Sequence, residues 1–105
     1  MNRLIFTLLV GLFFAGALLA QTATPKITKK QINQQARINQ GVRSGELTVH
    51  ETKQLERQQA KIQMDKKIAK SDGVVTKAER TKIRREQVKA SNNIFRKKHN
   101  KRVAK

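Results

Sequence analysis

Few side chains in this 105-residue sequence could carry out catalysis, because it contains two histidines, seven acidic residues and no cysteine. Neither His50 nor His99 is accompanied by a nucleophile or an orienting acid, and the carboxylates form no cluster suited to acid–base work. Both imidazoles are expected to be solvated surface groups. We therefore expect no enzyme active site, no metal centre and no bound cofactor.

The pattern Gly-x-hydrophobic-Thr-x-x-Glu occurs twice and is similar to the second half of a calcium-binding EF-hand loop, in which the last Glu binds the ion. Ser44 and Asp72 fit the fifth ligand position of such loops. The first and third ligand positions hold residues that cannot replace aspartate, namely Gln40 and Val42 in one copy and Ile68 and Lys70 in the other. We favour helix caps for both segments, with a degenerate EF-hand-like, calcium-responsive module as an alternative.

Positive charge is the feature that most directly suggests binding, since 24 Lys and Arg face seven Asp and Glu, for a formal net charge of +17. Such a chain attracts polyanions. No acidic residue follows Glu86. The candidate contact residues are basic side chains of the last third of the chain: Arg84, Arg85, Lys89, Arg96, Lys97, Lys98, Lys101 and Arg102. The alternative is a solvated helix that its charge keeps soluble.

An internal repeat predicts where the helices begin and end, because residues 44–51 align with 72–79 at an offset of 28. In each copy a glycine can end one helix in the left-handed conformation, and Thr with Glu three residues later can form the capping box of the next. These predicted caps are Gly45, Thr48 and Glu51, then Gly73, Thr76 and Glu79.

A third helix start is predicted upstream, where Thr28 and Gln31 repeat the spacing after Pro25 and Ile27 can pack against Ile32. The predicted fold is all-α, with helices over 29–43, 49–70 and 77–99 in an open helical hairpin arrangement with flexible ends. A homodimer would provide the support that this cysteine-free chain lacks. The predicted apolar stripes are thin: Ile32, Ala36, Val42; Leu55, Ile62, Ala69; and Ile83, Ala90, Ile94.

The first residues have the three parts of a secretory signal: Arg3, an apolar run over 4–14, and the small triplet Ala15-Gly16-Ala17. Cleavage after Ala17 or Ala20 is expected, and an uncleaved anchor is the alternative. The predicted organisation is a signal over 1–20, a flexible linker over 21–27 and a basic helical domain over 28–105. We therefore expect a periplasmic or secreted protein whose partners are acidic proteins or envelope polyanions such as lipid phosphates, lipopolysaccharide and wall polymers.

Sequence-specific nucleic-acid binding is not expected, because Phe95 is the only aromatic residue after the apolar run and no major-groove motif is present. The remaining interpretations are a non-enzymatic binder of acidic partners, a peripheral membrane or wall-polymer binder, and a structural or inhibitory protein that binds one particular envelope protein.

Two resemblances extend this interpretation. Residues 34–99 resemble small uncharacterised exported bacterial proteins with the pattern Gln-x-x-Arg-Ile-x-x-Gly-x-x-Ser-Gly-x-Leu-Thr-x-x-Glu, then Asp-Gly-x-x-Thr-x-x-Glu, then Ser-x-x-Ile-aromatic before Lys-His. Residues 47–51, 75–79 and 27–31 are similar to the Leu-Thr-x-x-Gln motif of the Spy and CpxP group of periplasmic chaperones, although the first two have Glu for Gln and the last has Ile for Leu. The second resemblance implies a basic, dimeric cradle and a stress-related chaperone role.

Overall fold

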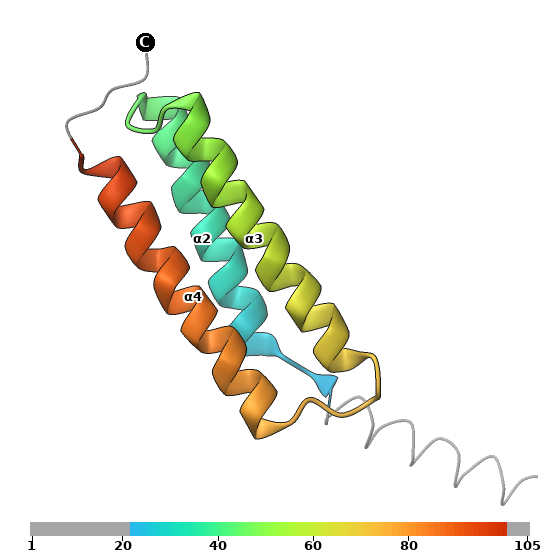
Figure 1. Ribbon diagram of the computed structural model, residues 1–105. Helices are drawn as coiled ribbons and strands as arrows, with labels where there is room; N and C mark the ends of the chain where they lie inside the picture. The colour runs from blue at the N-terminus through green and yellow to red at the C-terminus, as the bar shows by residue number, and fades with distance from the viewer. Residues whose placement is uncertain (1–21, 101–105) are drawn as a thin grey trace, which may run out of the picture.

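Three helices make up the all-α fold of the computed structural model, which describes residues 22–100 and confirms the predicted class (Figure 1). They are α2 over Pro25–Ser44, α3 over Val49–Lys70 and α4 over Lys77–Lys98. Each helix packs against the two others, with α2 and α4 running in one direction and α3 in the opposite one (Figure 1). The arrangement is therefore a closed three-helix bundle, more compact than the predicted open hairpin. The predicted signal over 1–20 and the tail residues Lys101 and Arg102 lie outside the described residues.

The start of α2 differs from the prediction. Pro25 is at the beginning of the helix after Thr24, whose side chain makes no capping hydrogen bond. Proline suits this position because its φ is already helical and the first turn does not need its missing N–H. The predicted cap formed by Thr28 and Gln31 is wrong, since both lie inside α2 and the last residues of the predicted linker are helical.

Both other predicted capping boxes are present. The backbone N–H of Glu51 donates to Thr48 Oγ1 at 3.1 Å, and the Thr48 N–H donates to Glu51 Oε1 at 3.0 Å. Thr76 and Glu79 repeat these contacts at the start of α4. Gly45, with φ 78°, ends α2 in the left-handed conformation. Gly73, with φ 85°, instead lies in the turn after the end of α3, which is capped by Ser71.

The core consists of two apolar clusters, one towards each end of the bundle. The predicted stripes of α3 and α4 are buried in them, whereas the predicted stripe of α2 is wrong, because Ile32 is 64% exposed and Val42 and Ala36 also face solvent. The face that α2 buries carries Ile27, Gln34, Ile38 and Gly41. One cluster contains Ile27, Ile62, Ala69, Val75, Ile83 and Ala90, and the other contains Ile38, Leu47, Leu55 and Ile94.

A layer of buried glutamines crosses the core, with one glutamine from each helix. Those of α2 and α3 lie in sequence between residues of the two clusters, whereas that of α4 lies within one cluster, between Ile83 and Ala90. Gln34, Gln59 and Gln87 each come from a different helix and are at most 8% exposed. Their side-chain amides bond to one another or to helix carbonyls, so the polar groups taken from water are compensated. This layer lets a chain with few large apolar residues close a bundle.

Candidate polyanion-binding surface

Most of the acidic side chains accept hydrogen bonds from backbone, hydroxyl or amide groups instead of forming ion pairs with Lys or Arg. All seven lie between residues 46 and 86. Glu51 and Glu79 cap helices, and Asp72 accepts from the Val74 N–H in the turn before α4. Glu46 and Glu56 accept hydrogen bonds from Ser44 and Gln35. Only Asp65 and Glu86 remain, and both contact Lys61.

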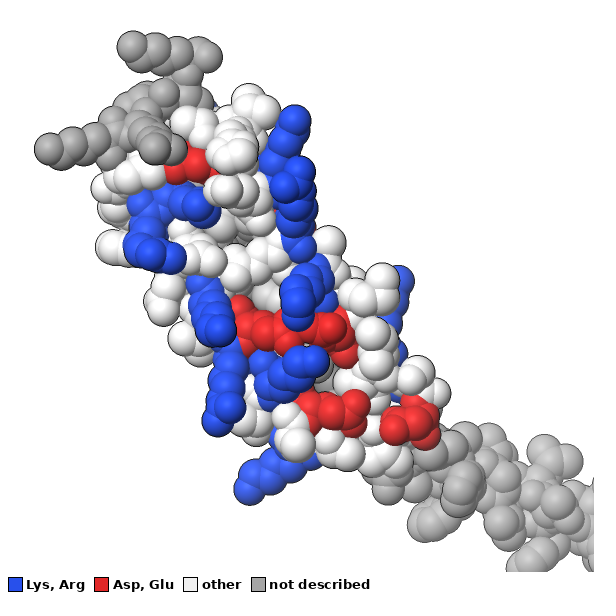
Figure 2. Space-filling model, in the orientation of Figure 1, with Lys and Arg blue, Asp and Glu red and all other residues white. Residues whose placement is uncertain are grey.

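The cations consequently keep their charge exposed to solvent. Within residues 22–100, Lys61 forms ion pairs with both Asp65 and Glu86, whereas many of the other Lys and Arg side chains are exposed. Figure 2 shows Lys and Arg side chains over the length of one face of the bundle, with acidic side chains in a few separate places. A surface of this kind attracts anions at a distance and offers them charge-assisted hydrogen bonds on contact.

The basic residues predicted from the sequence do not form a single patch. Arg84 lies beside Pro25 and Ile27 at the start of α2. Lys98 also faces α2, where it donates to Gln40, whereas Lys97 faces α3 and donates to Gln54 Oε1 at 2.9 Å. The helical repeat explains this division, since successive residues point about 100° apart around the axis.

Lys89 and Arg96 line one of two adjoining depressions between α3 and α4, and Arg57 and Lys61 of α3 line the other. We call this feature the α3–α4 groove. It consists of two depressions of about 550 and 490 Å³ that share Gln58 and Asn93. Its lining residues are Gln54, Leu55, Arg57, Gln58 and Lys61 from α3, and Lys89, Asn92, Asn93, Phe95, Arg96 and Lys97 from α4.

Sequence reasoning missed the α3 side of this groove. Arg57 and Lys61 are four residues apart and therefore share one helix face, which was the available signal. The amide side chains of Gln58 and Asn93 were also missed, and they join the two helices through a hydrogen bond of 3.1 Å from Asn93 Nδ2 to Gln58 Oε1. Which faces of two helices meet is decided by packing across the bundle, not by local spacing.

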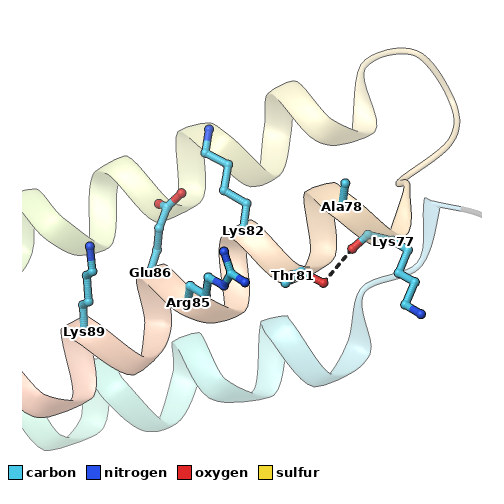
Figure 3. A pocket seen from close by; sticks show the side chains of 7 residues that line it. All are labelled: Lys77, Ala78, Thr81, Lys82, Arg85, Glu86 and Lys89. Carbon is cyan, nitrogen blue, oxygen red and sulfur yellow. Dashed lines mark hydrogen bonds between the residues drawn. The ribbon is translucent and has the colours of Figure 1, made fainter.

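A second basic depression, of about 790 Å³, lies on α4 itself (Figure 3). It contains Arg85 and Lys89 of the predicted set, with Lys82 and Glu86 pointing towards α3 (Figure 3). The remaining lining residues are Lys77, Ala78 and Thr81. Since all of them belong to one helix, this depression is a shallow surface feature next to the α3–α4 groove.

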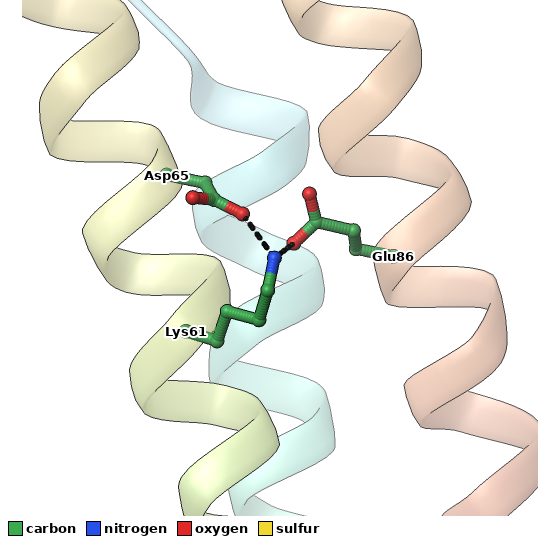
Figure 4. A network of polar contacts seen from close by, with 3 residues as sticks. All are labelled: Lys61, Asp65 and Glu86. Atoms are coloured by element: carbon green, nitrogen blue, oxygen red, sulfur yellow. Dashed lines mark hydrogen bonds and ion pairs between the residues drawn. The ribbon is translucent and has the colours of Figure 1, made fainter.

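Lys61 lies between two carboxyl groups at the edge of the groove (Figure 4). Its Nζ is 2.8 Å from Asp65 Oδ2 on the same helix and 3.5 Å from Glu86 Oε2 on α4. Burial raises the pKa of Glu86, and the neighbouring Asp65 raises it further, against the opposing effect of Lys61. Hydrogen bonds with Lys61 and Glu86 lower the pKa of Asp65. Glu86 is therefore the carboxyl of this pair that takes up a proton first.

The turns that are similar to EF-hand loops use their carboxylates differently from a calcium site. Glu51 and Glu79 each accept the backbone N–H of a capping threonine. Glu51 Oε2 also accepts a hydrogen bond from Asn100. Within residues 22–100, no group of three or more His, Cys, Asp or Glu side chains is placed to hold a metal ion.

No protein-family model, curated protein or solved structure matches this chain. Among the described helices, none combines the length and the apolar character needed to cross a membrane.

Proposed function

We propose that this protein is a non-enzymatic binding protein of the bacterial envelope that holds acidic partners against its basic helical surface. One observation carries the proposal: acidic side chains are engaged in helix caps, turns and amide contacts, which leaves a surface of exposed Lys and Arg. Such a surface would be costly to assemble without a partner, because like charges repel one another in the folded state.

A role as a stress-related chaperone is the finer form of this proposal. Several apolar side chains are exposed beside the cations, among them Val88 at 58% and Phe95 at 57%. A surface that combines charge with scattered apolar groups can attract an acidic unfolded chain and then contact its apolar residues. The similarity of the helix starts to the Leu-Thr-x-x-Gln motif supports the same proposal.

Binding to a membrane or a wall polymer is the second candidate, and the same positive surface supports it. The two candidates differ in their response to salt, because ions screen exposed charges but not hydrophobic contacts. A purely electrostatic ligand should be released as the screening length falls below about 10 Å. A chaperone client should retain a salt-resistant fraction.

The test compares suppression of aggregation of an acidic unfolded protein with binding to anionic vesicles, at low and high salt. A variant with Arg96, Lys97, Lys98, Lys101 and Arg102 changed to Gln removes five basic side chains near the C-terminal end. Loss of vesicle binding with aggregation suppression retained would favour a chaperone whose client surface lies elsewhere on the helices, away from the end of α4. The proposal fails if the intact chain binds neither target at low salt.

A further inference from the structure

We propose that the α3–α4 groove binds a single extended phosphate polymer, which lies along the groove between the two helices. This inference rests on the proposed function and names the ligand class of that basic surface. The phosphate chemistry could come from a free polyphosphate chain or from the phosphodiester backbone of a wall polymer.

Cations stand on both sides of the groove. Arg57 projects from α3, and Lys89 and Arg96 project from α4; all three are exposed. Lys89 and Arg96 are seven residues apart on one helix, which corresponds to about 10 Å at a rise of 1.5 Å per residue. A ligand with phosphates at intervals along a chain can contact both walls, whereas a single phosphate can contact only part of the set.

The floor of the groove carries amides that can bond to phosphate oxygens. Asn93 Nδ2 donates to Gln58 Oε1, which fixes the two side chains across the helix interface. This contact uses the oxygen of Gln58 and leaves its amide N–H groups to donate to a ligand. Asn92 adds an exposed amide further along α4. The cations would attract the anion, and the neutral amide donors between them would fix its position through hydrogen bonds.

The composition of the groove favours a chain over a lipid surface. A helix that binds at a membrane interface needs an apolar face that enters the lipid. In the groove, Leu55 is 1% exposed and Phe95 is the one exposed apolar side chain. Ile32 and Val42, which are both well exposed, lie on α2, away from the groove.

The carboxyl pair places the ligand towards one end of the groove. Asp65 and Glu86 contact Lys61, so this end carries negative charge beside its cation. The opposite end has Arg96 and Lys97, and no acidic residue lines either depression. Charge complementarity therefore favours a polymer that extends from Lys89, one helical turn after Glu86, towards Arg57 and Arg96 and away from the carboxyl pair.

The test measures binding of fluorescently labelled linear polyphosphate to the full chain by anisotropy, at one fixed low salt concentration. The groove variant is Arg57→Gln, Lys89→Gln and Arg96→Gln. The control variant is Arg43→Gln, Lys53→Gln and Lys67→Gln, which removes the same charge from exposed positions outside the groove. Circular dichroism checks that both variants remain helical.

We expect the groove variant to lose more than about tenfold in affinity and the control less than about threefold, because a contacted cation contributes more than a distant one. Affinity should rise with chain length from pyrophosphate to longer polymers. Unlabelled wall polymer and anionic vesicles serve as competitors and separate the possible sources of the phosphate.

Three outcomes separate this inference from the proposed function. Equal losses in the two variants, or equal affinity for pyrophosphate and long chains, would overturn the groove while leaving polyanion binding in place. Competition by vesicles but not by wall polymer or unlabelled polyphosphate would assign the surface to lipid and also overturn the inference. Absence of any binding to polyphosphate, vesicles or an acidic client would overturn the proposed function itself.

Discussion

The side-chain amide of Gln59 on α3 donates to the side-chain oxygen of Gln34 on α2 across 3.0 Å. Gln34 in turn donates to the backbone oxygen of Gln87 on α4 at 2.7 Å, and Gln87 donates to the backbone oxygen of Ile27 at 2.9 Å. The chain of contacts thus passes through all three helices. Each amide reaches its partner only when the three helices are aligned at the same height along the bundle axis. The network therefore favours one register of the helices.

Replacing Gln34 with methionine, which has a similar length, should lower the free energy of unfolding by about 1–3 kcal/mol, because it leaves the buried amide of Gln59 without its acceptor. Replacing Gln34, Gln59 and Gln87 together should recover much of that loss, since no amide then remains to be satisfied. Urea denaturation of the single and triple variants measures both. A triple variant less stable than the sum of three single losses would contradict this account.

The capping threonines should respond to the loss of their hydroxyl groups. Thr48→Ala should lower the free energy of unfolding by about 0.5–2 kcal/mol, because the Glu51 N–H then loses its acceptor. Thr48→Ser keeps the hydroxyl and should cost much less, and the same order is expected at Thr76. Thermal and urea unfolding provide the measurement. Equal losses from Ala and Ser would show that the hydroxyl is not the feature that matters.

The sequence predicted α3 and α4 closely, because their signals are local. A threonine followed three residues later by a glutamate marks the first turn of each helix. The apolar residues of these helices recur at the spacing that places them on one buried face. The start of α2 was misplaced because Thr28 and Gln31 match the same local pattern inside a helix that Pro25 had already begun. A capping pattern alone does not exclude an earlier start.

The buried face of α2 and the candidate site could not be predicted in the same way. Gln34 is fully buried while Ile32 is exposed, and this follows from the partners that the amide finds on α3 and α4. The groove could not be predicted from either helix alone, since its residues on α3 and α4, such as Arg57 and Lys89, are far apart in sequence. Composition predicted the positive charge of the surface, but not which Lys and Arg side chains lie close together in the folded protein.

Export is a prediction that the first residues can test separately from the fold. Residues 1–25 fused to a reporter should carry it across the inner membrane and be cleaved after Ala17 or Ala20. Fractionation and N-terminal sequencing of the reporter measure this. An intact amino terminus that stays in the membrane would favour the uncleaved anchor instead.

Glu51 should make stability depend on pH in the acid range. Burial acts to raise the pKa of Glu51, but hydrogen bonds from Thr48 and Asn100 and the charge of Lys97 outweigh it, so the pKa is lowered. A carboxyl with a depressed pKa in the folded state stabilises the protein above its unfolded pKa of about 4.3, and this contribution is lost as pH falls through the folded value.

Glu51→Gln should therefore reduce stability at neutral pH by about 0.3–1 kcal/mol, the usual value of a negative charge at a helix N-terminus. The difference from the unchanged protein should shrink as the pH falls below 4.3. Urea unfolding across this range measures the difference, with Glu79→Gln at the less buried cap as the counterpart. If the difference in unfolding free energy between the two proteins stayed constant with pH, the effect would come from the change in side-chain packing and not from the lost charge.

Glu86, in the carboxyl pair at the edge of the groove, should affect the pH dependence of stability in the opposite sense to Glu51. Its pKa is raised by burial and by Asp65, so its favourable contribution to stability is present below the unfolded pKa and is lost as pH rises through the folded value. When Glu86 is ionised, its charge lies beside that of Asp65, and within the described residues its Oε1 is buried without a hydrogen-bond partner. Lys61, at 3.5 Å from Oε2, compensates only in part.

Glu86→Gln should therefore leave the free energy of unfolding at pH 7 unchanged or raise it, by no more than about 1 kcal/mol, because the pair is partly solvated. Under acidic conditions, where Glu86 is protonated, the two proteins should be equally stable. Asp65→Asn is the matched comparison and should instead lower stability at pH 7, since the pKa of Asp65 is depressed by Lys61 and Glu86. If Glu86→Gln were the less stable protein at pH 7 and the loss disappeared on acidification, the charge of Glu86 would be net favourable and the assignment within the pair would be reversed.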